Sequence, residues 1–289
     1  PYITLIGEDR EKVNINYFDP KDTPVGGDTS KRCAIYVQSS ATGFAAENLT
    51  FENTYEYLGD GSISNESADA LRVDADQATF VNVKLMGYQD TLQANTGHQY
   101  FYKCYISGNV DYIYGTSQAL FNDCDLVFRY NGNKNSGYIT APKTDAKAAY
   151  GYIFNESRVY AEEGCSGSKY LLARPWGADA SATFINTYMS GIINKTDSYS
   201  DMSGNLYTDA RFSEFYSYGD GYAINSNRPQ ISRTQAEEML TAGFLGWDPY
   251  AVSENVSRND FTGNVVTESE DKFIENEYVN DKADTDTDD

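Results

Sequence analysis

Two aspartates, Asp90 and Asp111, occupy the same position in successive copies of a short sequence repeat. Each lies ten residues after a phenylalanine, Phe80 for Asp90 and Phe101 for Asp111. Repeats of equal phase stack on one another, and stacked β-strands are about 4.8 Å apart, so the two carboxyl groups should be neighbours. Carboxylates that close cannot both ionise freely: one pKa rises, and the pair divides into an acid and a base or nucleophile. The spacing therefore predicts an enzyme.

The repeat itself consists of short strands that contain a phenylalanine. A glycine follows seven residues after Phe80, Phe101 and Phe184, at Gly87, Gly108 and Gly191. A looser version keeps a small or apolar residue three positions after Phe51, Phe121 and Phe154. Such spacings are typical of a β-solenoid, in which each repeat buries its apolar face only against the next repeat.

The rest of the chain fits an all-β domain with one late helix. Residues 1–58 read as short strands separated by turn-forming clusters such as DPKDTPVGGDTS. Thr234 and Glu237 have the spacing of a capping box and predict a helix that runs to Gly243 and covers edge strands.

The two ends of the sequence suggest where this domain lies. The opening residues PYITLIGE already read as a strand, so we expect the first coil of the solenoid to be truncated. Residues 267–289 are acidic and polar, which predicts a solvated tail or a linker to a further domain. We therefore expect one solenoid domain over 1–266.

The strong negative charge limits the binding partners. The formal net charge is -21 and the pI is about 4.3, whereas nucleic acids and anionic membranes require a basic surface. No apolar run approaches the roughly 18 residues of a membrane span. We expect neither partner, and an acidic protein should tolerate a neutral, esterified polyuronate better than a fully ionised one.

Cysteine and histidine chemistry has little support in this sequence. No CxxC pair occurs, which disfavours a zinc cluster. Cys104 and Cys124 share a phase in adjacent repeats, which favours a disulfide between them, with two buried free thiols as the alternative. The chain has one histidine, His98, in a polar setting typical of the surface, and it lacks the GxSxG, HExxH, GxGxxG and P-loop motifs.

Three blocks carry a family resemblance. The segments GYQDTL at 87–92, NVDYIYG at 109–115 and LARPWG at 172–177 resemble the signature blocks of pectin methylesterases. The likeness extends in order from about residue 3 to residue 247, and DMSGN and RFSEFYSYGDG are most similar to the bacterial branch. It implies a right-handed parallel β-helix with a short C-terminal helix and a loop-rich C-terminal region. It also implies a secreted esterase, a monomer or part of a larger multidomain protein, that acts on methyl-esterified homogalacturonan without metal or cofactor.

The resemblance also assigns roles to single residues. Asp111 matches the nucleophile that attacks the C6 methyl ester, and Asp90 matches the general acid that protonates methanol and then activates water. Gln89 matches an oxyanion donor, and Arg174 matches the arginine that holds the nucleophile ionised. The positions that line the sugar-binding groove are Trp176, Tyr114 and Met202.

Some positions depart from the family pattern. Most relatives carry a glutamine two positions before a valine-alanine-leucine-arginine run, and this second oxyanion donor is here Ser67 in ESADALRV. Phenylalanines of the nucleophile block are here Tyr112 and Tyr114, a mild change where their hydroxyls reach water or sugar. Loss of an oxyanion donor costs on the order of 100-fold in turnover. Two alternatives thus stay open: a weak or inactive pectin-binding solenoid, and a pectate lyase or polygalacturonase on the same fold.

Overall fold

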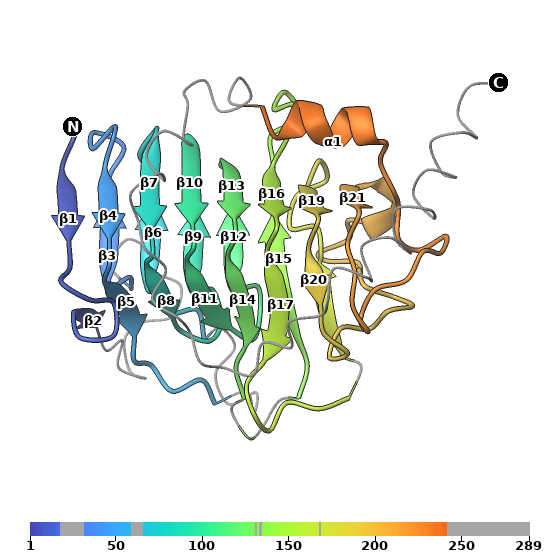
Figure 1. The fold of residues 1–289 in the computed structure, drawn as a ribbon, viewed down its shortest axis with the longest axis horizontal. Helices are drawn as coiled ribbons and strands as arrows, with labels where there is room; N and C mark the ends of the chain where they lie inside the picture. Colours follow the sequence, from blue (N-terminus) through green and yellow to red (C-terminus); the bar gives the residue numbers. More distant parts are fainter. Residues whose placement is uncertain (18–31, 59–65, 131, 133–134, 168, 242–289) are drawn as a thin grey trace.

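The chain winds into a parallel β-solenoid. The computed structural model describes residues 1–17, 32–58, 66–130, 132, 135–167 and 169–241. Successive strands fall in turn into three parallel sheets, A, B and C, so that three strands make one coil and the coils stack along one axis (Figure 1). This arrangement confirms the expected all-β fold class.

The three sheets have the following strands in spatial order. Sheet A contains β1 (Thr4–Ile6), β4 (Ala45–Glu47), β7 (Ala78–Val81), β10 (His98–Tyr102), β13 (Gln118–Asn122), β16 (Tyr152–Asn155), β19 (Ser181–Ile185) and β21 (Arg211–Phe215). Sheet B contains β2 (Asn14–Tyr17), β5 (Thr50–Asn53), β8 (Lys84–Met86), β11 (Tyr105–Gly108), β14 (Asp125–Phe128), β17 (Arg158–Ala161) and β20 (Tyr188–Met189). Sheet C contains β3 (Ile35–Val37), β6 (Leu71–Val73), β9 (Leu92–Ala94), β12 (Ile113–Gly115), β15 (Gly137–Pro142) and β18 (Tyr170–Ala173).

A ladder of stacked phenylalanines runs through the core along sheet A. Its ring centroids are 4.6 to 4.8 Å apart, the spacing of in-register parallel strands. The ladder consists of Phe80, Phe101, Phe121, Phe154 and Phe184. Both versions of the sequence repeat therefore belong to one stack.

Phe51 is the exception, and its assignment to the repeat was wrong. It lies on β5 in sheet B, opposite Leu85, and Ala46 takes the place beside Phe80 in sheet A. A phenylalanine buries equally well from either sheet because all three face the same core, so its phase cannot be read from residue type alone.

The predicted disulfide between Cys104 and Cys124 is also wrong. Both cysteines are buried and free, and their thiols lie 3.4 Å from the Phe80 carbonyl oxygen and 3.5 Å from the Phe101 carbonyl oxygen. Residues in register on parallel strands point their side chains the same way, about 4.8 Å apart. A disulfide needs its Cβ atoms roughly 3.5–4.5 Å apart, so stacking in phase disfavours the bond.

One α-helix, α1 (Arg233–Met239), covers the outer face of the last strands of sheet A within the described residues. The expected capping box at Thr234 and Glu237 was wrong: Ser232 is the N-cap, and Gln235 completes the box. Ser232 has the extended backbone (φ -74°, ψ 163°) that an N-cap requires, whereas Thr234 is already helical. The expected helix end at Gly243 and the tail 267–289 lie outside the described residues.

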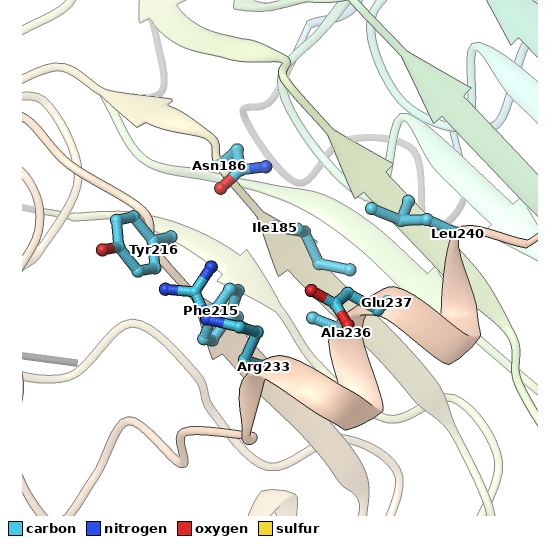
Figure 2. Close-up of a pocket in the computed structure, with 8 residues that line it drawn as sticks. All are labelled: Ile185, Asn186, Phe215, Tyr216, Arg233, Ala236, Glu237 and Leu240. Carbon is cyan, nitrogen blue, oxygen red and sulfur yellow. The ribbon is translucent and has the colours of Figure 1, made fainter. Parts of the chain in front are cut away.

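Below this helix lies a pocket of about 300 Å³, drawn in Figure 2. Its polar lining includes Arg233 and Glu237 from α1, and its apolar lining includes Ile185 and Phe215 from the strands beneath.

The 3-10 helix η2 (Tyr207–Asp209) precedes β21. Neither helix has the length and apolar character to span a bilayer, and the described residues contain no other candidate.

Candidate active site

Asp90 and Asp111 lie at equivalent corners of neighbouring coils, between sheets B and C. Both have left-handed backbone conformations, with φ of 64° and 50°, which aspartate tolerates better than most residues. The Asp90 N–H donates to the Val110 carbonyl oxygen at 3.0 Å, and Gln89 pairs with Val110 in a parallel bridge. The corners therefore stack directly, as the equal spacing from the phenylalanine ladder predicts.

Arg174 fixes one of these two carboxylates. It follows β18, and its backbone N–H donates to the Thr140 carbonyl oxygen on the neighbouring strand. Its Nε and Nη2 lie 2.8 and 2.5 Å from the two oxygens of Asp111, which is 5% exposed. Burial alone would lower the pKa of Arg174, but its hydrogen bonds to Asp111 and the charge of that carboxylate raise it. The bidentate pair holds the Asp111 carboxylate in one orientation.

Asp90 has a different chemical state. The pKa of Asp90 is raised to about 7, first by burial and second by the charge of Asp111. A hydrogen bond from Ser67 and the positive charges of Arg32 and Arg174 act in the opposite direction. Near neutral pH, Asp90 can therefore both give and accept a proton, while Asp111 is available as a nucleophile.

Trp176 forms one side of the site. Its ring centroid lies 5.9 Å from that of Tyr114, and the Lys143 ammonium lies 4.9 Å from the Trp176 ring. Asn205 donates to the Trp176 carbonyl oxygen at 3.2 Å and pairs with Met202 through an antiparallel bridge. Tyr114 thus contacts Trp176 directly, and Met202 is linked to Trp176 through Asn205.

The two positions expected to supply oxyanion donors differ in their surroundings. Gln89 immediately precedes Asp90 and is half-buried, and its carbonyl oxygen accepts from the Ala68 N–H at 3.2 Å. Ser67 is buried, and its hydroxyl hydrogen-bonds to the Asp90 carboxyl and to the Tyr114 hydroxyl. Ser67 therefore contacts the Asp90 carboxyl itself, which its residue type did not reveal.

Sequence reasoning missed two residues that contact this group. Asp69 is 1% exposed, and its carboxyl oxygens lie 3.1 and 3.3 Å from the Tyr114 hydroxyl. Arg32 is buried, and its Nη1 donates to the Ser67 carbonyl oxygen at 3.0 Å. Asp69 has a detectable signal, because it shares the period-two phase of the buried Leu71 on the following strand. Arg32 has none, because it reaches Ser67 from the neighbouring coil, 35 positions away in the sequence.

The two tyrosines of the nucleophile block keep their hydroxyls inside the protein. The Tyr112 side chain is fully buried, and its hydroxyl has no hydrogen-bond partner among the described residues. The Tyr114 hydroxyl turns toward Asp69, and 6% of Tyr114 is exposed. The ring of Tyr114, rather than its hydroxyl, adjoins Trp176.

A sequence profile described as Pectinesterase matches residues 1–242. The chain belongs to the pectinesterase family. Family membership makes it a carboxylic ester hydrolase. Among curated relatives, it is 38% identical to pectinesterase A of Dickeya chrysanthemi over 246 residues, which are 73% of this chain and 67% of that protein. It is 36% identical to pectinesterase 31 of Arabidopsis thaliana over 191 residues, covering 66% of this chain and 56% of that protein.

Solved pectinesterase structures have the same fold. Pectin methylesterase PemA from Erwinia chrysanthemi superposes with a TM-score of 0.75 at 34% identity, covering 85% of this chain and 83% of that one. A pectin methylesterase in complex with a hexasaccharide superposes with a TM-score of 0.74 at 32% identity and the same coverage. The pectin methylesterase from carrot gives a TM-score of 0.73 at 26% identity, covering 84% of this chain and 76% of that one. The expected right-handed parallel β-helix and the bacterial-type likeness agree with these matches.

Proposed function

We propose that this protein hydrolyses the C6 methyl esters of homogalacturonan, releasing methanol and leaving pectate. Asp111 is the nucleophile, and Asp90 is the general acid and base. The observation that carries the proposal is that two stacked carboxyl groups have different surroundings. Arg174 binds Asp111 through two hydrogen bonds, whereas Asp90 has a pKa raised to about 7. Family membership and relatives that bind a hexasaccharide support the substrate.

In the first half-reaction, an Asp111 oxygen attacks the ester carbonyl carbon. The negative charge that develops on the carbonyl oxygen requires a donor, and we assign that role to the Gln89 amide, since Gln89 immediately precedes Asp90. Collapse of the tetrahedral intermediate breaks the bond to the methoxy oxygen. Asp90 gives its proton to that oxygen, methanol leaves, and the galacturonyl group stays attached to Asp111 as an acyl-enzyme.

In the second half-reaction, Asp90 is ionised and acts as a base. It takes a proton from water, whose oxygen attacks the acyl carbon, and the bond to Asp111 breaks. Asp111 regains its carboxylate and its ion pair with Arg174, while Asp90 is again protonated. Each step uses side chains alone, and Trp176 and Met202 are placed to contact neighbouring sugar units.

Methanol release from highly esterified pectin tests this proposal. Wild type should release methanol, and Asp111→Ala should lower turnover on the order of 10⁴-fold or more, because it removes the nucleophile. Asp179→Ala is the matched control, since this aspartate is exposed and outside the carboxyl pair. Equal melting temperatures of the two variants establish that the loss is chemical. Full activity of Asp111→Ala rejects Asp111 as the nucleophile.

The same assay separates the alternatives. Unsaturated products that absorb in the ultraviolet indicate a lyase, and new reducing ends indicate a polygalacturonase. Retention on pectin without methanol indicates a binding solenoid. Since the proposed substrate is an extracellular polysaccharide, we further propose that the enzyme works as a secreted monomer, which a culture supernatant assay and light scattering can check.

A further inference from the structure

A hydrogen-bond network of polar side chains leads from Asp90 into the core. The Asp90 carboxyl hydrogen-bonds to the Ser67 hydroxyl, Ser67 to the Tyr114 hydroxyl, and Tyr114 to the Asp69 carboxyl at 3.1 Å. Ser67, Tyr114 and Asp69 are each at least nine-tenths buried. Three separate segments supply Asp90 and these three side chains, so the hydrogen-bond network forms only in the folded solenoid.

Two residues of this hydrogen-bond network replace apolar residues of the family pattern. Tyr114 stands at a phenylalanine position of the nucleophile block, and Asp69 stands at the valine of the valine-alanine-leucine-arginine run. Across the two strands, the Tyr114 hydroxyl donates to the two carboxyl oxygens of Asp69 at 3.1 and 3.3 Å. A buried carboxyl without a partner costs about 1–3 kcal/mol, so Asp69 would be unfavourable without the Tyr114 hydroxyl. The two polar residues therefore make sense as a pair.

The hydrogen bonds of this network can run in either direction. Ser67 has one hydroxyl proton and two acceptors within reach, Asp90 and the Tyr114 oxygen. When Asp90 is ionised, protons can point toward it: Asp69 donates to Tyr114, Tyr114 to Ser67, and Ser67 to Asp90. When Asp90 is protonated, every bond reverses, and Tyr114 donates to Asp69.

Only a neutral carboxyl at Asp69 can end the hydrogen-bond network in both of its orientations, because it offers an O–H donor and a carbonyl acceptor. Burial raises the pKa of Asp69 well above its ordinary value, and the nearby Asp90 carboxyl raises it further. Hydroxyls that rotate can thus satisfy both protonation states of Asp90 without moving the backbone.

We propose that Ser67 and Tyr114 form a reversible hydrogen-bond relay, anchored on a neutral Asp69, that holds Asp90 in position in both of its protonation states. The inference rests on the proposed role of Asp90 as proton carrier. Ser67, Tyr114 and Asp69 are positioning residues, since they act through Asp90. The other titratable or charged groups that act on this site are Arg32, Arg72, Tyr57, Asp111 and Arg174.

The test follows the titration of Asp90 by carbon-13 NMR of its carboxyl signal, assigned by its loss in Asp90→Asn. Ser67→Ala removes a donor to ionised Asp90 and should raise its pKa by about 0.5–1. Tyr114→Phe leaves the Ser67 proton without an acceptor when Asp90 is protonated, and should lower that pKa by a similar amount. Tyr112→Phe is the control, because its hydroxyl lies in the same block without a partner among the described residues.

Turnover gives the second readout. Ser67→Ala and Tyr114→Phe should each lower kcat about fivefold with little change in KM, and the double variant should lose less than the product of the two. Asp69→Asn keeps a donor and an acceptor and should retain activity, whereas Asp69→Val should lose about as much as Tyr114→Phe. Melting temperatures check that each variant folds.

Several outcomes overturn the relay. They are an Asp90 titration in Tyr114→Phe that matches Tyr112→Phe, losses that multiply in the double variant, or equal activity of Asp69→Val and wild type. The NMR titration needs no turnover. If wild type releases no methanol, the proposed function fails, and the titration still judges the relay. If methanol is released and the titration does not move, the relay alone fails.

Discussion

Two arginine–carboxylate pairs in this molecule have nearly the same geometry and opposite surroundings. Arg174 contacts Asp111 at 2.8 and 2.5 Å, and Arg228 contacts Glu214 at 2.8 and 2.6 Å, each through Nε and Nη2. Each guanidinium also lies over a tyrosine ring. Bidentate geometry of this kind is therefore no mark of catalysis by itself.

The pair of Glu214 and Arg228 is sealed inside the protein. Both side chains are 0% exposed, Tyr199 donates to Glu214 at 3.1 Å, and Arg228 donates to the Gly221 carbonyl oxygen at 2.8 Å. Glu214 pairs in register with Phe184, so this ion pair ends the phenylalanine ladder. Its partners satisfy both charges, which suits a structural role.

The pair of Asp111 and Arg174 differs in access and in its neighbour. The side chains are 7% and 23% exposed, and Asp90 stacks beside Asp111 with a pKa near 7. A reacting group needs an open side and a proton carrier within reach, and only this pair has both. Substitutions at Arg228, Arg174 and Asp90 test this difference between the pairs.

The largest expected effect is on stability, at the sealed pair. Arg228→Ala leaves Glu214 buried without its counter-charge and should lower the free energy of unfolding by about 3–5 kcal/mol, measured by denaturant titration. Activity per folded molecule should stay near that of wild type. In the double variant Glu214→Leu with Arg228→Met, much of the lost stability should return, because the pair is replaced by apolar groups of similar volume. A stable but inactive Arg228→Ala would contradict the structural role.

The next effect is on catalysis, at the open pair. Arg174→Ala should lower kcat about 10²–10³-fold, because it removes the charged group that orients Asp111, the proposed nucleophile. Arg174→Lys keeps the charge without the planar fork and should recover only part of the rate. Methanol release measures turnover, and denaturant titration should show a smaller loss of stability than in Arg228→Ala. A reversed order of the two stability losses would remove the distinction between the pairs.

The sequence could predict the stacking of the coils but not every contact within them. Equal spacing from a phenylalanine sets equal height in the solenoid, so Asp90 and Asp111 were predictable neighbours. The same logic failed for Phe51, because a phenylalanine fits the core from any sheet. It failed for Cys104 and Cys124, because residues in phase are parallel neighbours too far apart to bond.

The candidate site was predictable where its residues belong to a pattern. Arg174 was identified by resemblance, since nothing local shows that a residue 63 positions away reaches Asp111. Asp69 and Tyr114 are 45 positions apart, and only the fold reveals that their polar ends meet. The choice between Ser232 and Thr234 as helix cap depends on which backbone leaves the helix, and both residue types are suitable caps.

The smallest expected effect is a pH dependence of stability that belongs to the open site. The folded pKa of Asp90, about 7, is above the unfolded value of about 3.9, so the folded protein holds more protons between these limits. Stability from this group is fully present below about pH 4 and is lost as pH rises through 7. Asp90→Asn should therefore gain stability over wild type with rising pH.

Since Asp90 is only half-buried, solvent screening should hold this gain to about 1–2 kcal/mol between pH 4 and pH 8, measured by denaturant titration at each pH. Asp179→Asn, at an exposed aspartate, should show no such trend. A gain that instead falls as pH rises would mean that Asp90 is held ionised in the folded protein. Asp90 and Asp111 would then be two equivalent carboxylates, and the site would lack the proton carrier that separates it from the sealed pair.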